Sequence, residues 1–224
     1  MKVIAGAGTY DTRESIALSE AAAHGGADGI MAVTPYYSKP PQRGIAAHMR
    51  AIADATDLPL MIYNIPGRTA TRIEIETLVE LADHPRIVAT KDAVGDVEWS
   101  RQAIRALPEG FAVYSGNDGD TKDIVAAGGV GVVSVISHLA GREVAEMVHA
   151  VVDDDWDTAN ELHELLEPLT RALFAEPSPM PLKAALTAYW DGVGEPRLPL
   201  VPAHHDTVER VGKALEPITQ RRSR

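Results

Sequence analysis

The chain has 224 residues, of which 45% are hydrophobic and 24% are charged, so it can bury a full core and is most simply one domain. Its net charge of −11 argues against nucleic acid or an anionic membrane as a partner, because both require a basic face. The absence of cysteine excludes disulfides, thiolate metal sites and a cysteine nucleophile.

No apolar run approaches the roughly 18 to 20 residues that are needed to span a bilayer. The N-terminus also lacks the longer apolar stretch of a signal peptide. We therefore expect a soluble, cytoplasmic protein whose first residues enter a core strand almost at once.

Short apolar runs alternate with amphipathic stretches from residue 3 to residue 135. The runs lie roughly 25 to 30 residues apart, which is the size of a βα unit. The predicted strands are Val3–Gly6, Gly29–Thr34, Leu58–Tyr63, Ile87–Lys91, Phe111–Ser115 and Gly131–Val135.

Each predicted strand is followed by a helical pattern. Asp11-Thr12-Arg13-Glu14 has the spacing of a capping box and opens a helix that runs to about His24 and stops at Gly25-Gly26. Helical periodicity continues at about Gln42–Thr56, Ile73–His84, Val97–Ala106 and Asp120–Ala127, and then, without further strands, at about Gly141–Asp153, Trp156–Phe174, Pro181–Trp190 and Thr207–Ile218.

Apolar strands joined by helices indicate a parallel sheet that is covered on both faces. Periodicity alone does not separate a doubly wound sheet from part of a (β/α)8 barrel. The dinucleotide fingerprint is not met, because Gly6-Ala7-Gly8 lacks the third glycine and Gly128-Gly129-Val130-Gly131 precedes a strand instead of following one. Both glycine groups are better interpreted as tight turns.

Polar residues gather where the predicted strands end, which is where a barrel places its active site. A lysine that ends a buried strand can be desolvated, and its neutral amine can attack a carbonyl. Taken singly, such a lysine could cap the strand, the tyrosines could pack as rim aromatics, and the arginine could be solvated. Together they suit a Schiff-base enzyme that acts on an anionic carbonyl compound. The strand-end segments are Thr34-Pro35-Tyr36-Tyr37, Tyr63-Asn64-Ile65-Pro66-Gly67-Arg68-Thr69, Lys91-Asp92-Ala93 and Ser115-Gly116-Asn117-Asp118.

The first three of these segments, followed by Glu176-Pro177-Ser178-Pro179-Met180-Pro181-Leu182-Lys183, resemble the dihydrodipicolinate synthase family in sequence and order. This family of pyruvate-dependent class I aldolases includes N-acetylneuraminate lyase. The resemblance runs from Val3 to about Leu200 and implies a TIM (β/α)8 barrel followed by a C-terminal helical extension.

The resemblance implies a lyase of lysine and diaminopimelate biosynthesis that condenses pyruvate with L-aspartate 4-semialdehyde. Lys91 would form the pyruvate imine, and Tyr63 would transfer protons beside it. Arg68, which the sialic-acid lyases lack in this loop, would hold the carboxylate of the semialdehyde. Tyr37 would be donated across a subunit interface of a homotetramer or homodimer.

Gly116 and Val133 would line the pyruvate pocket, largely through their backbone. The family implies no metal and no organic cofactor, only the covalent imine on Lys91. His204 and His205 would lie about 100° apart on a helix, so we expect surface histidines instead of a ligand pair. Lys183, the rival lysine, falls in the helical region and is expected to be structural.

The chain differs from the family at its start. It supplies six βα units, which correspond to family strands 3 to 8, and it has no Gly-Thr-Thr turn of the kind that binds the pyruvate carboxylate and links the two tyrosines. We expect residues 1–139 to form a partial barrel with open edges, residues 140–219 to hold the last barrel helix and the helical region, and residues 220–224 to fray.

Three alternatives follow from this reading. The chain could act as another pyruvate or 2-keto acid aldolase of the same family. The missing units could reflect a misplaced start site or an inactive, N-terminally truncated homologue. Finally, the chain could be a non-catalytic fragment that fills its incomplete barrel by oligomerising.

Overall fold

The structure is a computed structural model, and it describes residues 1–223. The chain divides into two compact units, Met1–Val133 and the described residues from Ser134 onward. All strands within the described residues lie in the first unit, together with every residue predicted to take part in chemistry.

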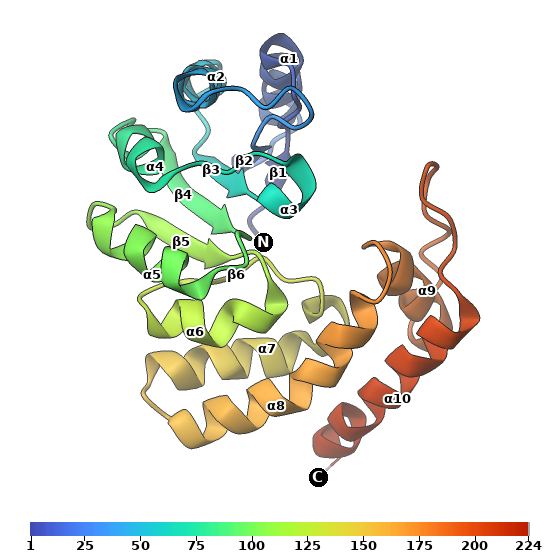
Figure 1. Ribbon diagram of the computed structural model, residues 1–224. Coiled ribbons are helices and arrows are strands. Elements are labelled where there is room, and N and C mark those ends of the chain that lie inside the picture. Colours follow the sequence, from blue (N-terminus) through green and yellow to red (C-terminus); the bar gives the residue numbers. More distant parts are fainter. Residues whose placement is uncertain (224) are drawn as a thin grey trace. The chain divides into compact units, whose positions relative to one another are not determined.

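The first unit contains one parallel sheet of six strands (Figure 1). The order of the strands in the sheet is their order in the chain, which a doubly wound sheet would reverse at its switch point. The sheet is therefore an arc of a TIM barrel, as the resemblance predicted. Within the described residues β1 and β6 each have one neighbouring strand. The strands are β1 (Ile4–Gly6), β2 (Gly29–Val33), β3 (Leu60–Asn64), β4 (Ile87–Asp92), β5 (Ala112–Ser115) and β6 (Gly131–Val132).

Helices of the first unit lie on the outer face of this arc (Figure 1), where α1 packs on α2, α2 on α4, α4 on α5 and α5 on α6. The sequence pattern indicated a parallel sheet that is covered on both faces, and in this unit the helices cover the outer face. Right-handed crossovers place successive helices on the same side when each new strand is added in one direction. The outer helices are α1 (Thr12–His24), α2 (Gln42–Asp54), α4 (Ile75–Ala82), α5 (Val97–Ala106) and α6 (Thr121–Ala126). The unit also contains the short helix α3 (Pro66–Thr69) and the 3₁₀ turn η1 (Asp118–Asp120), which follow the C-terminal ends of β3 and β5.

A bulge in β4 sets which face of the sheet its side chains occupy. Leu60 pairs with Ile87, but the next residue, Met61, pairs with Ala89, so Val88 is an extra residue on β4. Because side chains alternate along a strand, this insertion lets Ile87 pack among the helices while Lys91 projects from the inner face.

The first helix follows its sequence signals closely. The Asp11 carboxylate accepts a hydrogen bond from the backbone N–H of Glu14 at 2.9 Å, and the helix ends at His24, as predicted. Several boundaries differ from the prediction by a few residues, and two differences change the assignment of a segment. Pro66–Thr69 forms a short helix in a stretch expected to be loop, and β6 ends at Val132 although a strand to Val135 was expected.

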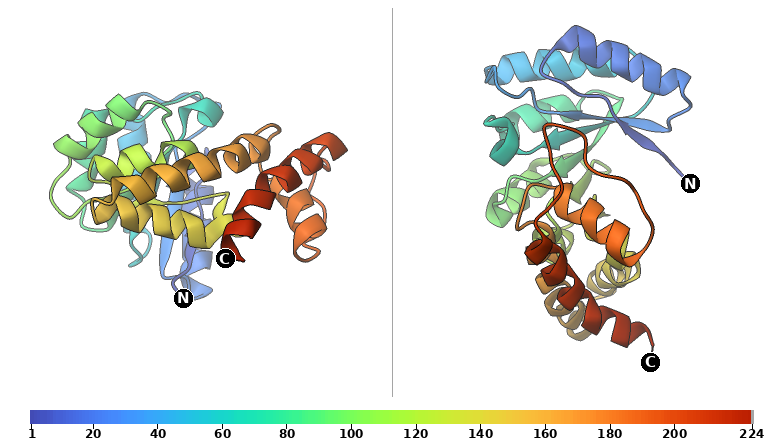
Figure 2. Two further views of the ribbon diagram at one scale, coloured as in Figure 1. Left: turned by 90° about the horizontal axis from the view of Figure 1, so that it is seen from below. Right: turned by 90° about the vertical axis from the view of Figure 1, so that its right-hand side faces the viewer.

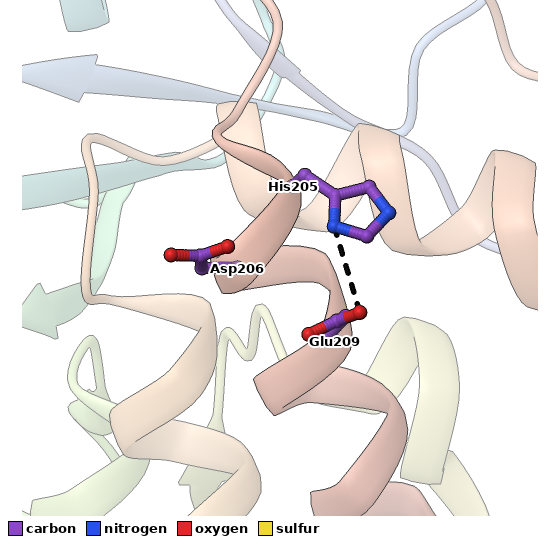
Figure 3. A group of neighbouring side chains, drawn as sticks. All are labelled: His205, Asp206 and Glu209. Atoms are coloured by element: carbon purple, nitrogen blue, oxygen red, sulfur yellow. Dashed lines mark ion pairs between the residues drawn. The ribbon is translucent and has the colours of Figure 1, made fainter.

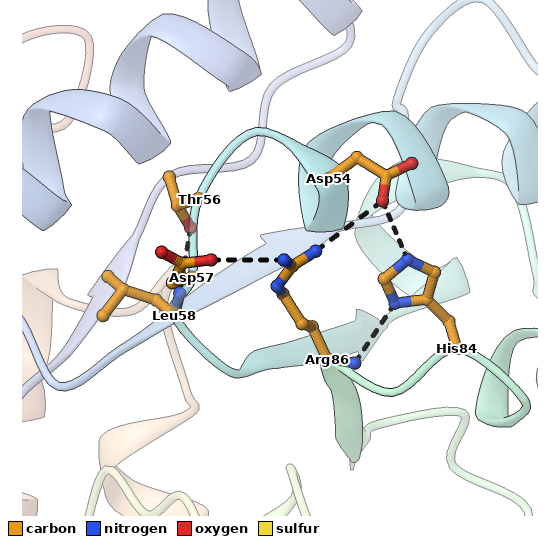
Figure 4. A network of polar contacts seen from close by, with 6 residues as sticks. All are labelled: Asp54, Thr56, Asp57, Leu58, His84 and Arg86. Atoms are coloured by element: carbon orange, nitrogen blue, oxygen red, sulfur yellow. Dashed lines mark hydrogen bonds and ion pairs between the residues drawn. The ribbon is translucent and has the colours of Figure 1, made fainter.

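A polar network joins the N-terminal ends of β3 and β4, at the opposite end of the strands from Lys91 (Figure 4). His84 Nδ1 accepts the backbone N–H of Arg86 at 3.2 Å, so Nε2 carries the ring hydrogen and donates to Asp54 at 3.1 Å. The Arg86 guanidinium bonds to Asp57 at 3.2 Å and lies 3.8 Å from Asp54. These contacts join the loops before β3 and β4 at the base of the barrel, whereas the other end of the strands is where a barrel places its chemistry.

The second unit, as far as residue 223, has helices and no strand: α7 (Ser137–Val152), α8 (Trp156–Leu173), α9 (Met180–Tyr189) and α10 (His205–Arg222). Figure 2 shows the long irregular segment that connects α9 to α10. No helix within residues 1–223 is both long and apolar enough to cross a membrane.

Residues 220–222 are helical, although they were expected to fray with the rest of the tail. Arg221 and Arg222 form ion pairs with Glu146 and Glu143 of α7, at 2.7 and 2.6 Å, and these contacts hold the last turn of α10. Arg224, the end of the predicted tail, lies outside the described residues.

The helix-covered core predicts a clear difference between two leucines. Leu78 is fully buried in α4, whereas Leu18 of α1 is 43% exposed. We expect Leu78→Ala to destabilise the protein by about 2 to 5 kcal/mol, because it leaves a cavity, and Leu18→Ala to cost less than about 1 kcal/mol. Urea unfolding followed by circular dichroism measures both, and equal shifts in midpoint would contradict the assigned core.

Candidate active site

Lys91 and Tyr63 lie side by side at the C-terminal ends of β4 and β3. Tyr63 is the register partner of Lys91 on one side, and Tyr114 of β5 is its partner on the other. The Lys91 ammonium nitrogen lies 4.2 Å from the centre of the Tyr63 ring. The parallel ladder thus brings together the lysine and the tyrosine that the sequence singled out.

Hydrogen bonds from the neighbouring strand hold the backbone of Tyr63. Its carbonyl oxygen accepts the backbone N–H of Thr34 at 2.9 Å and the Thr34 hydroxyl at 3.0 Å. Thr34 is fully buried, so water does not compete for these bonds. The end of β3 is therefore fixed to the end of β2.

Gly116 makes room for the stem of Lys91. A Cβ atom at this position would lie 2.8 Å from Ala93 Cβ and 3.0 Å from both Lys91 Cγ and the Asp92 carbonyl oxygen. The Gly116 N–H donates to that same carbonyl at 2.6 Å. Only glycine lets the end of β5 approach β4 this closely.

Asp92 anchors the turn that follows Lys91. Its carboxylate, only 2% exposed, accepts the Ser100 hydroxyl at 2.5 Å and the backbone N–H of Val94 at 3.0 Å. Burial raises the pKa of this carboxyl, and the two hydrogen bonds oppose that rise. Asp92 faces α5, so it supports the strand end and leaves Lys91 to face the inner side.

The surroundings of Lys91 favour its neutral form. Burial lowers the pKa of its amine, the negative charge of Asp118 opposes the change, and the positive charge of Arg68 adds to it. A larger share of the amine is thus unprotonated, and an unprotonated amine is what attacks a carbonyl carbon.

The surroundings of Tyr63 keep its hydroxyl protonated. Burial raises the pKa of the phenol, and the charge of Arg68 partly offsets that rise. The phenol therefore holds its proton at neutral pH, as a general acid must before it donates.

The remaining predicted site residues lie at the same end of the sheet. Arg68 is exposed on α3, in the segment that follows β3. Val133 directly follows β6, and its N–H donates to the Ser115 carbonyl at 2.9 Å. Tyr37, in the loop after β2, has a left-handed backbone (φ 69°) and is 91% exposed, so it hardly touches its own chain.

The sequence reasoning gave no role to Asp118, although it quoted the segment that contains it. Asp118 begins the 3₁₀ turn after β5, is 6% exposed and acts electrostatically on Lys91. Its position two residues after Gly116 could have identified Asp118 as a candidate from the sequence. Its burial beside Lys91 could be seen only in the folded structure.

Other candidate groups lie in the C-terminal unit. His205, Asp206 and Glu209, at the start of α10, have ligand atoms within 4.8 Å of one another (Figure 3), but all three side chains are exposed. His204 precedes this helix as its N-cap residue and is not in the group. Lys183, the rival lysine, lies in α9.

Comparison with known proteins agrees with this arrangement. The chain matches the dihydrodipicolinate synthetase family over residues 1–218. It is 46% identical over 216 residues to the 4-hydroxy-tetrahydrodipicolinate synthase of Thermosynechococcus vestitus, and the match covers 96% of this chain and 73% of that protein.

Solved structures agree as well. The dihydrodipicolinate synthase of Acinetobacter baumannii, complexed with pyruvate, is 39% identical with a TM-score of 0.92, over 96% of this chain and 74% of that one. A monomeric dihydrodipicolinate synthase variant is 38% identical with a TM-score of 0.93, over 96% and 73% of the two chains. The chain therefore belongs to the dihydrodipicolinate synthetase family of lyases, the pyruvate-dependent class I aldolases.

Proposed function

We propose that the protein condenses pyruvate with L-aspartate 4-semialdehyde through a Schiff base on Lys91, a step of lysine and diaminopimelate biosynthesis. The observation that carries the proposal is the partly buried Lys91 amine, 4.2 Å from the centre of the Tyr63 ring, with its pKa lowered. The relatives at about 46% identity carry the name of that synthase, which agrees with this choice of reaction.

Lys91 Nζ would attack the carbonyl carbon of pyruvate, and the carbonyl oxygen would leave as water to give the imine. Loss of a proton from the pyruvate methyl carbon gives an enamine, whose carbon forms the new bond to the aldehyde carbon. Tyr63, which holds its proton at neutral pH, supplies a proton to the departing oxygen and takes one back later. The reaction needs no metal and no organic cofactor.

Substrate binding would be divided between the two sides of Lys91. Gly116 and Val133, at the ends of β5 and β6, would line the pyruvate pocket with backbone groups. Arg68, on the segment after β3, would bind the carboxylate of the semialdehyde as a forked ion pair. Its charge also lowers the pKa of Lys91, so one residue would serve both binding and activation.

Tyr37 would complete the site of a neighbouring subunit in a homotetramer or homodimer. Its 91% exposure supports this role, because a side chain that hardly contacts its own chain is available to a second one. The existence of a monomeric variant among the solved relatives makes the oligomeric state a quantity to measure. A cytoplasmic location stays a prediction.

The imine predicts a specific covalent adduct. Borohydride added with pyruvate should reduce the imine to a stable amine, and peptide mass mapping should place a single adduct on Lys91. Lys91→Arg should abolish the adduct, whereas the control Lys183→Arg should retain it. An adduct on Lys183, or none on the unmodified protein, would show that this chain does not use Lys91.

Arg68→Ala should act selectively on the carboxylated acceptor. Loss of a charge-assisted ion pair is expected to raise the KM for aspartate semialdehyde about 10- to 100-fold. The KM for an aldehyde without a carboxylate should change little. Steady-state kinetics on both acceptors distinguishes this reaction from that of another 2-keto acid aldolase, for which the two acceptors would respond alike.

Imine formation should depend on pH through the pKa of Lys91. Because the neutral amine reacts, the trapping rate should rise with pH until it passes that pKa, which lies below the ordinary 10.5. Asp118 stabilises the charged amine, so Asp118→Asn should move the rise to lower pH. Arg68→Ala removes a repelling charge and should move it to higher pH. Shifts in the reverse directions would refute the assigned charges.

A further inference from the structure

The Arg68 side chain has no fixed partner within residues 1–223: it is exposed and makes no hydrogen bond or ion pair there. The position of its guanidinium therefore depends on the backbone that carries it. That backbone is the segment between the end of β3 and the start of α4, residues 65–74.

The segment is tightly folded on itself. The Thr69 hydroxyl lies 3.0 Å from the Ile65 carbonyl oxygen and 2.9 Å from that of Thr71. Ala70 ends α3 in the left-handed conformation (φ 55°), and its N–H donates to the Pro66 carbonyl at 2.9 Å. These bonds fix the internal shape of the loop. The position of the loop relative to the sheet depends on the contacts of its last residues, 72–74.

The Asn64 side chain binds the backbone of the last part of the loop. The side-chain amide of this fully buried residue donates to the Ile73 carbonyl at 3.1 Å, and its oxygen accepts the Ile73 N–H at 3.1 Å. Two paired residues of neighbouring strands form a similar pair of hydrogen bonds through their backbones, but here the Asn64 side chain takes the place of one backbone. Residues 65–72 are thereby closed into a loop whose two ends lie at the end of β3.

Gln42 holds the same stretch through the neighbouring backbone groups. From the first turn of α2, its amide donates to the Arg72 carbonyl at 2.8 Å and accepts the Glu74 N–H at 3.1 Å. In an extended backbone the polar groups of successive residues point to opposite sides. Asn64 and Gln42 therefore grip residues 72–74 from two sides.

We infer that Asn64 and Gln42 form a double-amide clamp that positions Arg68 for the carboxylate of the acceptor. Both are positioning residues, because neither is required to touch substrate. The inference rests on the proposed function for the identity of the acceptor. The clamp sets specificity through the acceptor, and it can act on the reaction of pyruvate with Lys91 only through the charge of Arg68, which is the smallest of the three effects on the pKa of Lys91.

Hydrogen exchange tests the clamp without any substrate. Removal of a hydrogen-bonding partner should speed exchange of the backbone N–H groups within residues 65–74 about tenfold or more in Asn64→Asp and in Gln42→Ala. Gln102→Ala is the matched control, since Gln102 lies exposed on α5 and bonds only to Glu98. Should Asn64→Asp fail to fold, the half-buried Gln42 still provides the test. Exchange equal to that of the unmodified protein would overturn the clamp.

Kinetics tests the link to Arg68. Gln42→Ala should raise the KM for aspartate semialdehyde about tenfold while the KM for pyruvate and the yield of trapped imine stay within about twofold. Added to Arg68→Ala, it should cause no further rise, because effects that act through one residue are not additive. An additive rise, or an equal rise for pyruvate, would show a general structural effect. Failure of the unmodified protein to trap pyruvate would instead refute the proposed function. The hydrogen-exchange experiment would then still test whether Asn64 and Gln42 hold residues 65–74.

Discussion

The parallel pairing of β3, β4 and β5 is the constraint on which the site depends. It places Tyr63, Lys91 and Tyr114 in one row across three strands, so residues far apart in the chain become neighbours without any loop having to bring them together. The bulge at Val88 decides the face of the sheet on which this row lies. A change of one residue in that register would turn the lysine toward the helices.

The two ends of the strands carry different kinds of polar interaction. At the N-terminal ends, Asp54, Asp57, His84 and Arg86 form a closed set of ion pairs and hydrogen bonds. At the C-terminal ends, charges of both signs act on one amine, and burial lowers its pKa. Barrel proteins can divide stability from chemistry in this way, because the carboxyl ends of all the strands meet at one rim.

Side-chain amides and hydroxyls extend the strand ladder past its last backbone bond. Thr34 binds the Tyr63 carbonyl, and Asn64 and Gln42 bind the segment behind Arg68. Thr34 and Asn64 are buried, so their bonds are shielded from competing water, whereas the bond from Gln42 to Arg72 is exposed. A rim built in this way can hold an exposed arginine in place without pairing it to an acid that would compete with the substrate.

The sequence alone determined the alternation of strands and helices, the cap at Asp11 and the strand-end positions of Lys91, Tyr63 and Arg68, because these depend on local periodicity and on motifs contiguous in the chain. Its motifs also identified the family. Periodicity left open the choice between a barrel arc and a doubly wound sheet; the family resemblance predicted the barrel, and the order of strand pairing confirmed it.

The tertiary structure also decided which groups act on Lys91. Asp118 is buried by its tertiary surroundings, and the extra residue at Val88 is defined by the pairing of β4 with β3. The hydrogen bonds from Asn64 to Ile73 and from Gln42 to Arg72 join segments that are separated in sequence. Local patterns predict the conformation of a segment, but they do not predict its distant neighbours. The pKa of an amine depends on those neighbours and on burial, so the reactivity of Lys91 could be derived only from the fold.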